Sequence, residues 1–149
     1  MDNFPSSSGT RSVGQRLIDV LAASDAVRAS VAYAQALGVA VNVAVVDVSG
    51  VQVAFLRMPG APLHSIDIAI DKAYTAASFG LPTGQWHAAL AGHSPAVRDG
   101  IVLRPRFVAF GGGLPIVEGG ARIGAIGVSG GSEAQDEAIA RAGLEALDG

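Results

Sequence analysis

The segment 107–137 constrains the fold more than any other part of the sequence. It holds nine of the chain's 20 glycines, and these glycines separate short apolar runs. Residues 115–118 and 122–129 are two such runs, and Gly119-Gly120 between them is typical of a two-residue hairpin turn. The longer run is apolar on both faces, so we expect it to be a central strand whose glycines allow another element to approach closely.

Two features frame this predicted hairpin. Residues 108–110 have the composition of the end of another strand, and Gly111, Gly112 and Gly113 follow it as a loop. Beyond the hairpin, Ser132 and Gln135 have the spacing of a capping box. The sequence therefore predicts a strand before the hairpin and a final helix after it.

The rest of the chain supplies two more strands and three more helical segments. Residues 12–37, 65–79 and 83–91 have helical patterns, and residues 39–48 and 51–57 form a second predicted hairpin. Residues 92–105 are expected to be irregular. Two hairpins without regular strand-helix alternation predict an α+β fold, in which helices pack against an antiparallel sheet.

Length and composition limit the organisation of the chain. A chain of 149 residues supports one domain. We expect residues 1–11 to form a disordered tail and residues 12–149 to form the domain. Only 15% of the residues are charged while 50% are hydrophobic, against about 25% charged in ordinary soluble domains. So few charges predict that other copies of the chain cover part of the surface, as in a homo-oligomer.

Several classes of function are disfavoured. The net charge of −3 and a single lysine argue against a nucleic-acid partner. The absence of cysteine excludes disulfides, thiolate metal sites and cysteine nucleophiles. Residues 29–46 carry no charge, but their polar side chains are unlike those of a membrane span. Residues 1–11 lack the pattern of a secretion signal, so we expect a cytoplasmic protein.

The helix predicted over 65–79 presents two stripes. One is wholly apolar and is expected to face the core, and it consists of Ile66, Ile70, Ala73 and Ala77. The other places a lysine and a threonine between two apolar side chains, and it consists of Ile68, Lys72, Thr75 and Phe79. The second stripe predicts the wall of a cleft that contains a cation.

Lys72, the chain's single lysine, has two interpretations. As a buried cation it would bind a ligand carboxylate or, with a lowered pKa, act as a base or form a Schiff base. Alternatively, it forms a salt bridge with Asp47, Asp67 or Asp71.

The three histidines favour no metal pair. His64 precedes the helix that carries Lys72, and it is expected either to face the same pocket or to have a surface or capping role. We predict that Lys72, Thr75 and His64 share a pocket with the loop 111–113. His87 and His93 lack the i, i+4 spacing of a helical metal pair.

The motifs of segment 107–137, taken with others upstream, resemble a known family. The run 111–137, together with Val45-Val46-Asp47, Arg57-Met58, Gly60-Ala61 and the Lys-Ala-x-Thr-Ala motif at 72–76, is similar to the GlcG/HbpS-like haem-binding family, which includes the C-terminal domain of PduO-type proteins. The resemblance covers roughly residues 17–147. It implies a five-stranded antiparallel sheet in a profilin-like layered arrangement, and haem as a cofactor.

Haem binding requires an apolar slot, an iron ligand and cations for the propionates. Candidates for the slot are Ile68, Phe79, Phe107, Phe110, Gly111, Gly112 and Gly113, and candidates for the cations are Arg57, Arg104 or Arg106. Some relatives are thought to use a histidine in the first helix as the iron ligand. This chain has none between residues 12 and 37, so His64 would have to substitute.

The leading interpretation is a protein that binds a small ligand, haem or a related tetrapyrrole. The alternative is a catabolic isomerase or hydrolase that acts on a small acidic or aromatic substrate and uses Lys72 and His64 as catalytic residues. A structural subunit without a ligand is the third interpretation.

Overall fold

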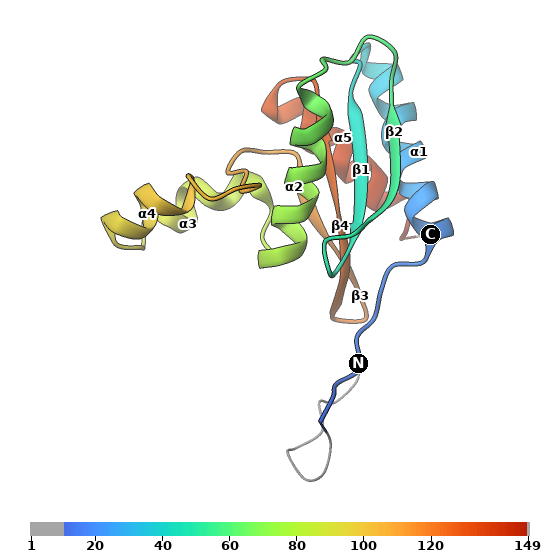
Figure 1. Ribbon diagram of the computed structural model, residues 1–149. Helices are drawn as coiled ribbons and strands as arrows, with labels where there is room; N and C mark the ends of the chain where they lie inside the picture. Colours follow the sequence, from blue (N-terminus) through green and yellow to red (C-terminus); the bar gives the residue numbers. More distant parts are fainter. Residues whose placement is uncertain (1–10, 149) are drawn as a thin grey trace.

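A four-stranded antiparallel sheet lies at the centre of the computed structural model, which describes residues 11–148 (Figure 1). Its strands are β1 (Asn42–Asp47), β2 (Gln52–Arg57), β3 (Gly113–Glu118) and β4 (Ala121–Ser129). Their order across the sheet is β2-β1-β4-β3. Both predicted hairpins are therefore present, and β1 and β4 are the central strands.

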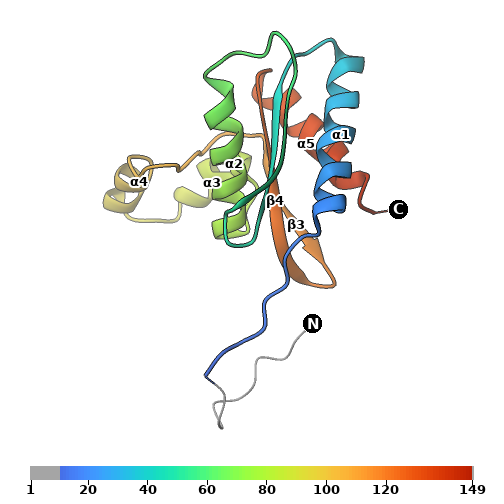
Figure 2. The ribbon, with the colours of Figure 1, turned by 45° about the vertical axis from the view of Figure 1, so that its right-hand side comes forward.

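Helices cover both faces of this sheet. Helix α2 (Ser65–Phe79) packs on one face, whereas α1 (Val20–Leu37) and α5 (Glu133–Glu145) lie on the other (Figure 2). The short helices η1 (Thr83–Gln85), α3 (Trp86–Leu90) and α4 (Pro95–Ile101) follow α2 and extend away from the sheet (Figure 1). The predicted α+β class is confirmed. No helix in the range 11–148 has the length and apolar character needed to cross a membrane.

The sheet in the described part of the chain has four strands. The prediction of a fifth strand, ending at residues 108–110, was therefore wrong. Residues 107–109 form no ladder, because side chains bind the backbone groups of this segment. The Val108 amide donates to Thr75 Oγ1 (3.1 Å), and the Gly111 amide donates to a Glu133 carboxylate oxygen (2.6 Å). A segment whose hydrogen bonds are satisfied in this way does not need a neighbouring strand.

Helix boundaries differ from the sequence prediction at two places. Helix α1 begins at Val20 rather than near residue 12, because the Asp19 side chain caps it by accepting a hydrogen bond from the Leu21 amide (2.9 Å). Helix α4 lies in the stretch expected to be irregular, where Ser94 is the N-cap and Pro95 is the first helical residue. The tail predicted at residues 1–11 falls, except for its last residue, outside the described residues.

The Gly119-Gly120 turn and the capping box of Ser132 and Gln135 were predicted correctly. Gly119 and Gly120 have φ angles of 57° and 80°, which suits the type of hairpin turn that favours two glycines. Ser132 and Gln135 exchange both hydrogen bonds of a capping box at the start of α5.

Candidate functional site

Lys72 is completely buried and joins three elements. Its ammonium nitrogen donates to the Val128 carbonyl oxygen (2.8 Å), at the end of β4, and to Asp136 Oδ2 (3.0 Å), in α5. It also lies 5.0 Å from the centre of the Phe110 ring. Lys72 therefore forms a salt bridge, as one of its two interpretations predicted. Its acidic partner is Asp136 rather than Asp47, Asp67 or Asp71.

The burial of Lys72 lowers its pKa from the ordinary value of 10.5. Removing an ammonium group from water disfavours its charged form. The nearby carboxylate of Asp136 and, to a smaller extent, that of Glu133 act in the opposite direction, and desolvation outweighs them.

This shift predicts how stability changes with pH. Between the lowered pKa of folded Lys72 and 10.5, the unfolded chain binds more protons than the folded chain, so the free energy of unfolding rises with pH. Urea unfolding of the wild type and Lys72→Met should be compared across the alkaline range, since subtracting the two curves removes the titration of other groups. The wild type should gain stability relative to the variant as pH rises. Parallel curves would contradict this prediction.

The glycine loop packs directly against Lys72. A Cβ on Gly112 would lie 2.7 Å from the Lys72 ammonium nitrogen, and one on Gly113 would lie 2.7 Å from Thr83 Cγ2. The Gly113 amide also donates to Thr83 Oγ1 (2.8 Å). Lys72 and the loop are therefore neighbours, but their close packing leaves no space for a flat ligand between them.

Thr75 holds the segment that follows α4 against α2. Its hydroxyl donates to the Arg106 carbonyl oxygen (2.9 Å) and accepts from the Val108 amide. Arg106 adopts a φ of 68°, which is uncommon for a residue other than glycine. Its guanidinium group donates to Asp71 (2.9 Å) and stacks 3.5 Å from the centre of the Tyr74 ring.

These contacts form a small cleft, here called the aromatic cleft. Its volume is about 180 Å³, and its lining consists of Tyr74, Thr75, Ser78, Phe79, Ile101, Arg104, Pro105, Arg106 and Phe107. Five of these residues were candidates from the sequence: Thr75, Phe79, Arg104, Arg106 and Phe107.

Trp86 supports this cleft and was not a candidate from the sequence. Its ring makes edge contacts with Phe79 and Phe107, at centroid distances of 4.8 and 4.9 Å. The indole is buried, and its N–H has no hydrogen-bond partner among the described residues. A lone tryptophan in a predicted short helix carries no periodic signal, so only its position in the fold reveals its role.

The remaining candidates lie elsewhere. His64 is exposed at the N-terminus of α2, about 12 Å along the helix from Lys72 at 1.5 Å per residue. Ile68 is half-buried, about three turns before Phe79 in α2. The Arg57 guanidinium group donates to the Ala61 carbonyl oxygen (2.7 Å), and Phe110 lies over Lys72. Within residues 11–148, no group of three or more histidine and acidic side chains could hold a metal ion.

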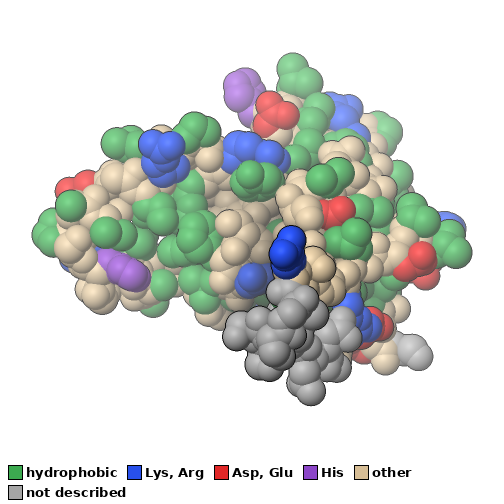
Figure 3. Space-filling model, turned by 60° about the horizontal axis from the view of Figure 1, so that its bottom comes forward, with side chains coloured by type: hydrophobic (Ala, Val, Ile, Leu, Met, Phe, Trp, Pro, Cys, Tyr) green, Lys and Arg blue, Asp and Glu red, His purple; other side chains and the backbone are tan. Residues whose placement is uncertain are grey.

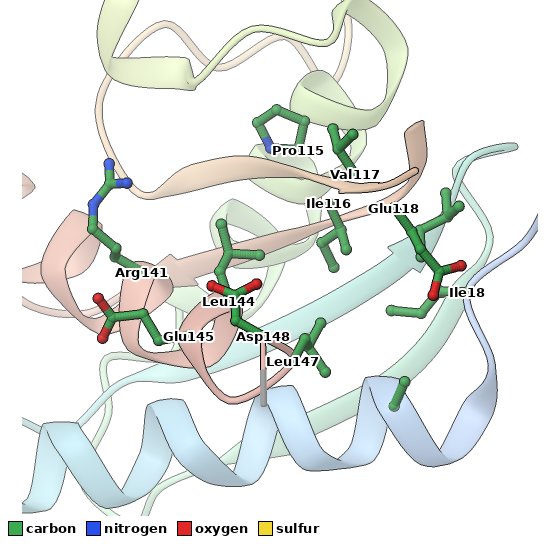
Figure 4. A pocket seen from close by; sticks show the side chains of 12 residues that line it. Ile18, Pro115, Ile116, Val117, Glu118, Arg141, Leu144, Glu145, Leu147 and Asp148 are labelled. Atoms are coloured by element: carbon green, nitrogen blue, oxygen red, sulfur yellow. The ribbon is translucent and has the colours of Figure 1, made fainter. Parts of the chain in front are cut away.

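A larger hollow, here called the α5 groove, lies on the opposite face of the sheet. Its volume is about 560 Å³, and Figure 4 shows apolar side chains of α5 and β3 at its base with charged side chains around them. None of the candidates from the sequence lines it. The lining residues are Ile18, Ala22, Pro115, Ile116, Val117, Glu118, Ile123, Arg141, Leu144, Glu145, Leu147 and Asp148.

Comparison with known proteins now identifies the family. Residues 18–145 match the family model described as "Haem degrading protein HbpS-like". The chain belongs to the HbpS-like family. The resemblance seen in the glycine-rich run and the Lys-Ala-x-Thr-Ala motif is thereby confirmed.

Relatives in this family match the chain over most of its length. An uncharacterised 15.0 kDa protein of the dhaT-dhaS intergenic region of Citrobacter freundii is 36% identical over 128 residues, which cover 86% of this chain and 90% of that protein. The chain also matches the corrinoid adenosyltransferase PduO of Citrobacter freundii, but it spans only 36% of that protein's length.

Two solved structures share the fold. A double mutant of Streptomyces reticuli HbpS is 34% identical with a TM-score of 0.82, covering 99% of this chain and 98% of that one. The structure described as a PduOC:Heme complex is 33% identical with a TM-score of 0.79, covering 87% of this chain and 94% of that one.

Proposed function

We propose that this HbpS-like chain binds haem, or a related flat tetrapyrrole that carries carboxylates, at the aromatic cleft. The observation that carries the proposal is the meeting of two phenylalanines and two arginines there, from α2 and from residues 104–107. The family description and the PduOC:Heme complex support haem as the class of ligand.

The chemistry of the cleft suits part of a haem molecule. Phe79 and Phe107 present aromatic surface to the edge of a macrocycle. Arg104 lies at the same cleft and carries a charge that would pair with a propionate, whereas Arg106 is already paired with Asp71. At about 180 Å³ the cleft is smaller than the 300–1,000 Å³ of most ligand pockets, so it would hold one side of the ligand.

The charged residues that line the two hollows favour the aromatic cleft over the α5 groove as the site for haem. The α5 groove has three carboxylates, Glu118, Glu145 and Asp148, against one arginine, Arg141. Such a groove repels propionates, although its volume is larger. The lining of the aromatic cleft includes two arginines and no carboxylate, and because Asp71 pairs with Arg106, the charge of Arg104 makes the cleft positive.

The iron ligand would be Tyr74 rather than His64. Tyr74 lines the cleft, and a tyrosine phenol is one of the side chains that hold haem iron in proteins. His64 lies at the far end of α2. Bound haem would supply iron-centred redox chemistry, while these residues would bind and orient it.

The burial of Lys72 supports a structural role for this residue. Its ammonium group already contacts Val128 and Asp136, and its side chain is 1% exposed. A base or a Schiff-base lysine has to reach a substrate. We therefore infer no catalytic role for Lys72 and His64 as a pair.

Haem titration tests the proposal. Adding haemin to purified protein should shift the Soret band and saturate at one haem per cleft. Arg104→Glu should weaken binding about tenfold or more, because a charge-assisted hydrogen bond contributes roughly 1.5–3 kcal/mol. Arg141→Glu, the same change in the α5 groove, is the matched control and should leave the affinity unchanged. A wild type without a Soret shift would refute haem binding, and a larger loss for Arg141→Glu would refute its location.

A further inference from the structure

The segment that leaves α2, here called the arm, spans residues 86–105 and projects from the body of the molecule (Figures 1 and 3). Helix α4 within it buries none of its seven residues against the rest of the described chain. Val97, Val102 and Leu103 are 42%, 47% and 81% exposed. Isolated helices shorter than about 12 residues are marginal in water, so α4 needs a packing partner.

The α5 groove is a hollow of complementary character. Ile18, Ile116 and Leu147 are among the apolar side chains that line it (Figure 4). Leu17 and Leu21, the sequence neighbours of the lining residues Ile18 and Ala22, are 55% and 72% exposed. The groove can therefore accept apolar side chains from another molecule.

Charge distinguishes the arm from the groove. The arm carries Arg98 and Arg104 against the single acid Asp99, so it is positive. In the groove, Glu118 pairs with Arg16 and Arg141 pairs with Glu137, so Glu145 and Asp148 make it negative. Two arms packed against each other would bring like charges together, whereas an arm in a groove pairs opposite charges.

We propose that the arm of one copy of this chain docks into the α5 groove of a second copy. The inference rests on the self-association expected from the low charge content and is independent of whether haem binds. The arm extends from the α2 side of the sheet, and the groove lies on the α1 and α5 side (Figure 2). The contact is therefore heterologous, and repeating it produces a closed ring if the rotation between copies closes.

This contact also bears on the aromatic cleft. Ile101, Arg104 and Pro105 of the arm form one wall of the cleft, and α2 forms the other. A docked arm fixes the first wall. The second copy thereby sets the width of the cleft in its neighbour without contributing to its lining.

Charge reversal on each surface tests the contact in ligand-free protein. The arm variant is Arg98→Glu with Arg104→Glu, and the groove variant is Glu145→Arg with Asp148→Arg. Each variant alone brings like charges together, so light scattering at micromolar concentration should give a mass near the 14.9 kDa of one chain. An equimolar mixture pairs each reversed surface with an opposite charge, so it should regain the wild-type mass. Arg11→Glu with Arg28→Glu, two exposed arginines elsewhere, is the control and should assemble like the wild type.

Three results would overturn the inference. A wild type that scatters as a single chain would remove self-association itself, while the haem titration would stand. A groove variant that assembles normally would indicate contact between arms or at another surface. A mixture that stays at the mass of one chain would show that the two surfaces do not meet.

Discussion

Asp136→Ala is expected to lower the free energy of unfolding by about 3–5 kcal/mol, the cost of leaving a buried charge without its partner. The change leaves the Lys72 ammonium group among apolar atoms, with the Val128 carbonyl oxygen as its remaining hydrogen-bond acceptor. It also removes the carboxylate oxygen that accepts from the Gly131 amide (2.8 Å). Urea unfolding followed by circular dichroism measures the loss.

A matched aspartate gives the control. Asp25 is exposed in α1, so Asp25→Ala should change stability by no more than about 0.5 kcal/mol. Lys72→Met together with Asp136→Leu replaces both charges by apolar groups and should recover part of the loss. If Asp136→Ala costs no more than Asp25→Ala, the buried ion pair does not stabilise the fold.

Gly127→Val is expected to cost about 3 kcal/mol, at the upper end of the range for overpacking a core. A Cβ at this position would overlap the Ala69 carbonyl oxygen and lie 2.6 Å from the Ala73 nitrogen. Both atoms belong to the backbone of α2, so the helix has to move away from β4. Gly124→Val should also destabilise, because its Cβ would overlap the Val46 carbonyl oxygen. Thermal unfolding of both variants measures the effect.

Gly100 is the matched control for these glycines. It lies in α4, and a Cβ there would meet no heavy atom within 4 Å. Gly100→Val should therefore leave thermal stability nearly unchanged, since valine forms helix slightly better than glycine does. Equal melting temperatures for Gly127→Val and Gly100→Val would refute close packing of α2 on β4.

The clefts show why tertiary contacts were harder to predict than elements. The stripe of Lys72, Thr75 and Phe79 on α2 follows from helical spacing, and Lys72 packs against the glycine loop while Thr75 and Phe79 line the aromatic cleft. His64, predicted to share a pocket with Lys72 and Thr75, is exposed at the N-terminus of α2. Which of these residues borders an open cleft depends on how closely the glycine loop packs against each of them. Because that loop closes over Lys72, the opening lies further along the helix, at Phe79.

The sequence by itself determined the features that depend on neighbours along the chain. The Gly119-Gly120 turn, the capping box of Ser132 and Gln135 and the two hairpins require only backbone preferences and local hydrogen bonds. The family could likewise be recognised from motifs in order.

Only the tertiary structure decided which distant residues meet. Lys72 pairs with Asp136, 64 residues away, although three aspartates were closer in sequence. Residues 108–110 have the composition of a strand, yet Thr75 and Glu133 bind the backbone amides of Val108 and Gly111 and leave no ladder to form. In both cases the choice of partner depends on the packing of helices on the sheet, and local sequence preferences contain no information about that packing.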